Sequence, residues 1–292
     1  MAEGKKRVGV VLFQLGGPDS LDAVEPFLRN LFLDPDIIPM GPLGFLRGPL
    51  ASYIAKKRAV PVAGRYAMIG RRSPIAILTE RQLVKLSAAL SSFIDPVVVT
   101  AMRYWKPFTQ DAVVALKAAG PLDELVLLPL YPHYSYATTL SSMKEWRRVY
   151  GKPVGGPPEH AIESFYAHPS YIEAVVKKIG VCLRQFPDSS RIHLLFSAHG
   201  LPMSLVEKGD PYPRHIAETV RLVNESGRRQ FSLGLIYRFR TVSMKSLNRA
   251  CTRRCKQKRH NQQKREIKPL SHSITRPKFP QTSNPACSAP KK

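Results

Sequence analysis

The residue with the clearest capacity for chemistry is His199, which lies where an apolar run ends in a Gly-Pro turn. Residues 196–202 read FSAHGLP, and the apolar run at 192–198 predicts a buried strand. Ligands of open α/β sheets bind at the carboxyl ends of the strands, so this position favours a functional site. A neutral imidazole binds borderline divalent metals and accepts protons near neutral pH. The alternative is a structural histidine whose ring is hydrogen-bonded by a loop carbonyl.

The elements that must position His199 alternate between apolar strands and amphipathic helices. Strands are predicted at 8–12, 96–102, 124–130 and 192–198, with a further candidate at 231–236. Helices are predicted at 21–31, 50–57, 73–90, 109–119, 141–150, 168–185 and 213–225, and the Pro- and Gly-rich residues 34–47 predict a loop. This alternation is typical of α/β proteins with doubly wound parallel sheets.

The predicted elements divide the chain into three parts. Residues 1–160 form a first Rossmann-like α/β domain, and residues 161–236 form an incomplete second one that carries His199. Residues 237–292 are basic and rich in Pro, Ser, Thr and Asn. Such a composition buries too little apolar surface to offset the entropy of ordering, so we expect a disordered basic tail.

The positive charge is concentrated near the C-terminus. The chain has a formal net charge of +24, and residues 227–292 hold 18 Lys or Arg against one acid, Glu266. The remaining residues are only mildly basic, so we expect no nucleic-acid partner. A non-enzymatic, basic-tailed protein that binds nucleic acid or an anionic surface stays open as an alternative. We see neither a long apolar run nor a signal peptide, which predicts a cytoplasmic location.

Several segments, in order, resemble the ferrochelatase family over residues 7 to about 230. Besides FSAHGLP they are LGGPDS at 15–20, IAKKR at 54–58, Ser73-Pro74, MRY at 102–104, LYPHYS at 130–135 and DPYP at 210–213. The resemblance implies a chelatase-like fold and a lyase of heme biosynthesis. Such an enzyme inserts Fe²⁺ into protoporphyrin or coproporphyrin and releases two protons. A related chelatase that acts on another tetrapyrrole with cobalt or another metal is the alternative.

The resemblance also implies roles for individual residues. His199 would be the metal ligand and the catalytic proton acceptor. The porphyrin-binding residues would be Leu15, Arg58, Ser73, Arg103, Tyr104 and Tyr131, with apolar residues 43–46 covering the macrocycle. We expect no permanently bound cofactor, since Fe²⁺ is a substrate. The expected partners are porphyrin, ferrous iron and, transiently, a membrane surface. His133 is expected to be an exposed loop histidine and receives no role.

Two features depart from the family pattern. The family has consecutive glycines before Ser73-Pro74, where this chain has Gly70-Arg71-Arg72. The glutamate that faces the histidine in the family has no counterpart, because Glu266 is the only acid near the C-terminus and its context does not match. We therefore expect impaired activity, and we hypothesise that the last sixty or so residues arise from a reading-frame error or a truncation.

Overall fold

The computed structural model describes residues 4–37, 40–151, 155–186, 194 and 196–230. All described residues belong to the first of the two units into which the chain divides, residues 1–243. The expected disordered tail at 237–292 and the candidate strand at 231–236 lie outside the described residues, and the predicted domain boundary at 160 stays a prediction.

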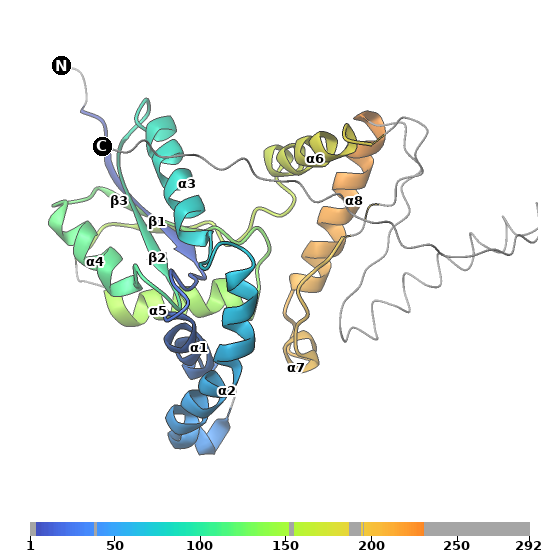
Figure 1. Cartoon of the computed structure of the whole chain (residues 1–292). Helices are drawn as coiled ribbons and strands as arrows, with labels where there is room; N and C mark the ends of the chain where they lie inside the picture. Colours follow the sequence, from blue (N-terminus) through green and yellow to red (C-terminus); the bar gives the residue numbers. More distant parts are fainter. Residues whose placement is uncertain (1–3, 38–39, 152–154, 187–193, 195, 231–292) are drawn as a thin grey trace, which may run out of the picture. The chain divides into compact units, whose positions relative to one another are not determined.

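The described residues of the first unit form a parallel sheet of four strands in the order β2-β1-β3-β4 (Figure 1). The strands are β1 (Arg7–Gln14), β2 (Asp95–Met102), β3 (Glu124–Pro129) and β4 (Glu159–Ala161). In the central strand β1, Val10 lies beside Val98 of β2 and Val126 of β3. The predicted α/β class and the first three strands are confirmed. The fourth strand was not predicted, because its Glu-His-Ala sequence is exposed and carries no apolar signal.

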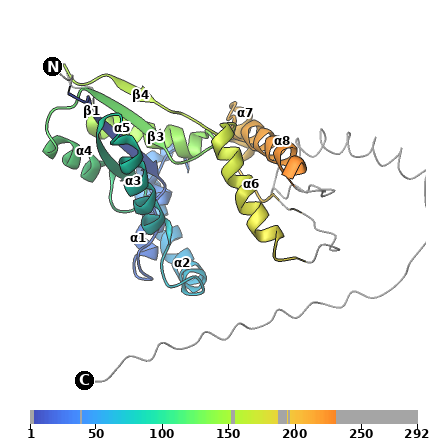
Figure 2. The same cartoon turned by 90° about the horizontal axis from the view of Figure 1, so that it is seen from above.

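Helices cover both faces of this sheet. Together with those farther from the sheet, the helices of the described residues are α1 (Val24–Leu33), η1 (Gly41–Leu46), α2 (Arg47–Ala67), α3 (Ile75–Leu90), α4 (Thr109–Ala118), η2 (Tyr136–Leu140), α5 (Ser141–Tyr150), α6 (Pro169–Leu183), α7 (Met203–Glu207) and α8 (Tyr212–Gln230). Side chains alternate along β1: Val11 and Phe13 pack with α4 and α5, whereas Val10 and Leu12 pack with α3. Helices α3 and α4 accordingly lie on opposite sides of the sheet (Figures 1 and 2).

Gly9 lets β1 approach its neighbours closely. A Cβ atom at this position would come within 2.7 Å of Leu122 Cδ1 and 2.9 Å of Leu125 Cδ1. Real Cβ contacts are longer than this, so only glycine fits without a shift of the core.

The connection between α1 and α3 is more helical than the sequence predicts. The expected loop at 34–47 contains the 3₁₀ helix η1, and the short helix expected at 50–57 extends over all of α2 despite Pro61 in its interior. Proline removes one backbone hydrogen bond, but Ala51 and Ala55 are fully buried against α1, and this packing holds the helix together.

Helices α6 and α8 pack on one another through Ile172, Val176 and Val223. Between them, the predicted strand at 192–198 is not found: Leu194 and residues 196–198 have no regular secondary structure, and its other residues lie outside the described ones. A strand needs a paired neighbour, and none is described beside this segment. Among the described residues, no helix is long and apolar enough to span a bilayer.

Candidate functional site

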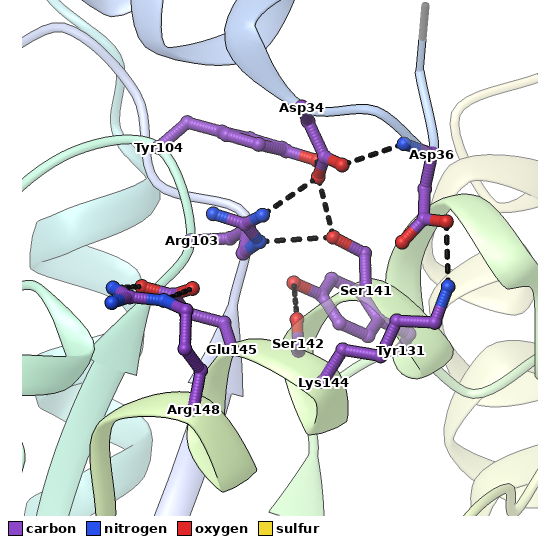
Figure 3. Close-up of polar contacts among 10 residues, drawn as sticks. All are labelled: Asp34, Asp36, Arg103, Tyr104, Tyr131, Ser141, Ser142, Lys144, Glu145 and Arg148. Carbon is purple, nitrogen blue, oxygen red and sulfur yellow. Dashed lines mark hydrogen bonds and ion pairs between the residues drawn. The ribbon is translucent and has the colours of Figure 1, made fainter. Parts of the chain in front are cut away.

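A buried carboxylate, Asp34, organises the residues that follow β2 (Figure 3). Its Oδ2 atom accepts hydrogen bonds from the Tyr104 hydroxyl at 2.6 Å and the Ser141 hydroxyl at 2.5 Å, and lies 3.0 Å from Arg103 Nη2. Arg103 Nε also donates to Ser141 at 2.9 Å. We call Asp34, Arg103, Tyr104 and Ser141 the Asp34 cluster. It joins the ends of α1 and β2 to the first residue of α5.

The hydrogen bonds of the Asp34 cluster decide its protonation. Burial alone would raise the pKa of Asp34, but hydrogen bonds from Ser141 and Tyr104 and the charge of Arg103 outweigh it and hold the pKa below its ordinary value. Burial and the neighbouring Asp34 charge raise the pKa of Tyr104 far above that of free tyrosine. The cluster therefore carries an ionised carboxylate, a neutral phenol and a guanidinium.

The structure brings Arg103 and Tyr104 together but gives them different exposures. Tyr104 is fully buried, whereas the Arg103 side chain is 19% exposed and its Cζ lies 5.1 Å from the Tyr104 ring centroid. The Tyr104 ring thus packs against the Arg103 guanidinium, and the Tyr104 hydroxyl donates a hydrogen bond to Asp34. Asp34 and Ser141 were not predicted, because only the folded chain brings positions 107 residues apart into contact.

Tyr131 lies next to this cluster. Its hydroxyl is 3.4 Å from Ser142 Oγ, and burial raises its pKa well above the ordinary value (Figure 3). The phenol is neutral at physiological pH and serves as a hydrogen-bonding group.

Leu15 and Ser73 flank the turn that follows β1. The Leu15 carbonyl accepts from Tyr104 N at 3.0 Å, and Ser73 N donates to the Pro18 carbonyl at 2.8 Å. A Cβ atom on Gly17 would lie 2.5 Å from Ser73 Oγ, so glycine is required for this close approach. The first turn of the sheet and the start of α3 are thereby held together.

Two further arginines lie on α2 and in the turn before α3, Arg58 and Arg71 respectively. Arg58 is exposed on α2, with its Cζ 5.9 Å from the ring centroid of Phe32. Arg71 adopts a left-handed backbone with φ of 64°, directly after Gly70 at 95°. The loop therefore has the positive φ that glycine would favour, but with an arginine in place.

His133 is not the exposed loop histidine that the sequence predicts. Its ring is half-buried and stacks on Tyr166 with a centroid distance of 6.2 Å, and its Nε2 is 2.9 Å from Thr219 Oγ1. Burial, reinforced by nearby His215, lowers its pKa to about 4. The aromatic rings of Tyr166, Tyr171 and Tyr212 supply this environment, and local sequence around position 133 does not reveal them.

His199, the predicted metal ligand, is exposed. Its backbone N–H donates to the Tyr212 hydroxyl at 3.2 Å. The start of α8 is in turn bound to the loop after β3 through Asp210, which accepts from Ser135 Oγ at 2.8 Å. Within the described part of the chain, no three His, Cys, Asp or Glu side chains gather as a metal site. A metal on His199 would need further ligands from its substrate or from elsewhere.

Comparison with known proteins decides the family. The family model described as "Ferrochelatase" matches residues 7–267. The chain belongs to the ferrochelatase family. The match ends later than the motifs indicate, since they stop near residue 230. Membership makes the chain a chelatase of heme biosynthesis, in the lyase class, with porphyrin and iron as its substrates.

Individual ferrochelatases agree with this assignment. The ferrochelatase of Geobacter metallireducens is 49% identical over 220 residues, which cover 75% of this chain and 68% of the relative. That of Synechococcus is 43% identical over 221 residues, covering 74% of this chain and 56% of the relative. That of Picosynechococcus is 42% identical over 238 residues, covering 80% and 61% respectively.

Proposed function

We propose that this ferrochelatase inserts Fe²⁺ into protoporphyrin or coproporphyrin, with His199 as metal ligand and proton acceptor. The observation that carries the proposal is an exposed imidazole in the FSAHGLP motif of a family member. Metal entry requires both pyrrole N–H protons to leave as iron binds the four ring nitrogens. An accessible imidazole near neutral pH can accept these protons in turn and pass them to water.

The porphyrin side of the site draws on residues from the first sheet and its helices. Arg58 and Arg103 are suited to pair with propionates, because guanidinium binds carboxylates through two parallel hydrogen bonds. Ser73 and Tyr131 would add hydroxyl contacts, and Leu15 apolar contact. Tyr104 would act through Arg103, since its own hydroxyl is bonded to Asp34.

The direct test measures metal insertion by the purified full-length chain under anaerobic conditions, with Fe²⁺ and each porphyrin. We expect metalloporphyrin formation to fall at least 100-fold in His199→Ala, since general acid–base catalysis contributes about 10²–10⁴-fold. His168→Ala, at another exposed histidine, is the matched control and should retain the wild-type rate. Equal rates for wild type and His199→Ala would refute the role of His199.

A related cobalt or other tetrapyrrole chelatase is the second candidate. A pair of arginines suits the two propionates of protoporphyrin, whereas a tetrapyrrole with more carboxylates than coproporphyrin would require a more basic site. A substrate panel with Fe²⁺ and Co²⁺ separates the two: preference for Co²⁺ and for a tetrapyrrole with more carboxylates than coproporphyrin would favour the alternative.

The C-terminal sequence bears on how active the chain is. We propose that turnover is impaired relative to other ferrochelatases, because no counterpart of the family's facing glutamate is found in the sequence. Measuring kcat beside the Geobacter metallireducens enzyme tests this, and equal kcat values would contradict it. Reading the DNA through codons 225–245 tests the reading-frame hypothesis.

We also propose a cytoplasmic location with transient contact between η1 and a membrane surface. Leu43, Phe45 and Leu46 of η1 are exposed, Phe45 by 76%, and Lys56 and Lys57 of α2 are exposed as well. Exposed apolar side chains and exposed cations both favour binding to anionic bilayers. We expect less Phe45→Ser than wild-type protein to float with phosphatidylglycerol vesicles. Binding to duplex DNA is measured in parallel, and there we expect no specific binding.

A further inference from the structure

A buried carboxylate, Asp210, joins the loop after β3 to the start of α8. Asp210 is 4% exposed. Its Oδ2 accepts from Ser135 Oγ and Tyr136 N, each at 2.8 Å, and its Oδ1 accepts from Tyr212 N at 2.9 Å. A buried carboxylate is costly unless it is hydrogen-bonded, so these three donors fix the position of residue 210 and the first turn of α8.

Tyr212 carries this constraint to His199. Its hydroxyl accepts the backbone N–H of His199 at 3.2 Å, and its ring packs edge-on against His133 with a centroid distance of 5.8 Å. Residues 196–200 have no regular secondary structure, so no strand ladder orients this N–H. The Tyr212 hydroxyl therefore provides an orienting contact for the backbone of the proposed metal ligand.

We infer that Asp210 and Tyr212 are positioning residues for His199, an inference that rests on the proposed function. Asp210 holds Tyr212 in place, and Tyr212 holds the His199 backbone. Because Ser135 belongs to the same loop as Tyr131, the link also couples the proposed porphyrin-binding segment to the proposed metal ligand. A catalytic side chain acts efficiently only when neighbouring contacts restrict its position.

The first test reads the His199 backbone directly. Full-length protein labelled with ¹⁵N-histidine contains 8 histidines, and His199→Gln assigns the His199 amide signal. Tyr212→Phe removes the hydroxyl but keeps the ring. We expect the His199 amide proton to shift upfield and to exchange about 3- to 10-fold faster, the effect of losing one neutral hydrogen bond.

The second test reads catalysis. In Tyr212→Phe we expect kcat to fall about 3- to 10-fold while KM for porphyrin stays within about twofold, since only the metal-ligand segment is loosened. Asp210→Asn should give a fall in the same direction, because an amide NH₂ cannot accept from Tyr136 N and Ser135 Oγ as Oδ2 does. If Asp210→Asn does not fold, Tyr212→Phe alone decides.

Tyr150→Phe is the matched control. It removes a hydroxyl at the last residue of α5, outside the link from Asp210 to His199, keeps the ring that stacks on Trp146, and should change neither readout. An unchanged His199 amide in Tyr212→Phe overturns the inference, as does an unchanged kcat in active protein. If the wild type inserts no metal, the proposed function fails, and the amide readout still decides whether Tyr212 positions His199.

Discussion

Asp34 illustrates how one side chain can organise a site without being part of its chemistry. It holds three donors from distant parts of the chain on a single oxygen atom, and the adjacent Asp36 N–H donates to its other oxygen at 2.8 Å. Arg103, the proposed propionate partner, is oriented by this carboxylate. The Asp34 carboxylate thus balances the charge of Arg103, and this allows the guanidinium to be mostly buried.

Replacing Asp34 should therefore destabilise the protein. In Asp34→Asn the Arg103 charge loses its partner, and we expect the free energy of unfolding to fall by about 2–4 kcal/mol. Urea unfolding measures this. The neighbouring Asp36→Asn, which breaks a partly exposed ion pair with Lys144, is the control and should cost under about 1 kcal/mol. A similar small loss in both variants would show that the Asp34 cluster is not a strong structural unit.

The half-buried His133 predicts a specific loss of stability in acid. Its pKa is about 4 when folded and about 6.5 when unfolded, so the unfolded chain binds the proton first as pH falls. The stability contributed by neutral His133 is complete above about pH 6.5 and declines towards pH 4, by about 1–3 kcal/mol.

Comparing unfolding at pH 7.5 and pH 5 tests this assignment. In His133→Gln the decline should be smaller than in wild type, because this titration is absent. His168→Gln, which removes an exposed imidazole, supplies the baseline. Parallel declines in wild type and His133→Gln would mean that the ring is protonated in the folded protein at mildly acidic pH.

Among the elements, the turn before α3 contains a residue, Arg71, in an unfavourable backbone conformation. Arg71 has a φ of 64°, a backbone conformation that costs a residue with a side chain about 1–2 kcal/mol. Glycine avoids this cost, but part of the gain is lost because glycine has more conformational freedom in the unfolded chain. We expect Arg71→Gly to raise the free energy of unfolding by up to about 1 kcal/mol. Arg72→Gly, one residue later, has no such strain to relieve and should be neutral or destabilising. Stabilisation by Arg72→Gly alone would contradict this account.

The elements also show where sequence patterns suffice. Strands β1, β2 and β3 and helices α3, α4 and α5 were predicted within a few residues, because apolar runs and helical periodicity are local signals. β4 was not predicted because its own residues carry no strand signal, and it forms a strand only by pairing with β3. The same holds for the candidate site: motifs predict roles for His199 and Arg103 and include Tyr212 in DPYP, but the contacts of Asp34 and Tyr212 became apparent only in the folded chain.

For the whole molecule, the charge distribution predicts how the proposed contact with anionic surfaces depends on salt. Residues 227–292 carry +17 of the net +24, so they dominate electrostatic attraction. We expect binding of the full-length chain to phosphatidylglycerol vesicles to weaken at least tenfold between 50 and 300 mM salt, since screening and counterion release act on these lysines and arginines. Flotation at both salt concentrations measures this, with neutral vesicles as control. Binding that is insensitive to salt would assign the attraction to the apolar residues of η1.

The central place of β1 has a consequence for biosynthesis. The first strand to leave the ribosome pairs with Asp95–Met102 on one side and with β3 on the other, so it stays unpartnered until the nascent chain has grown well beyond residue 100. Such non-local pairing is slow and leaves apolar edges open to chaperones. Once residue 161 has emerged, every strand of the sheet is available. The sheet can therefore assemble before the basic residues 227–292 are translated.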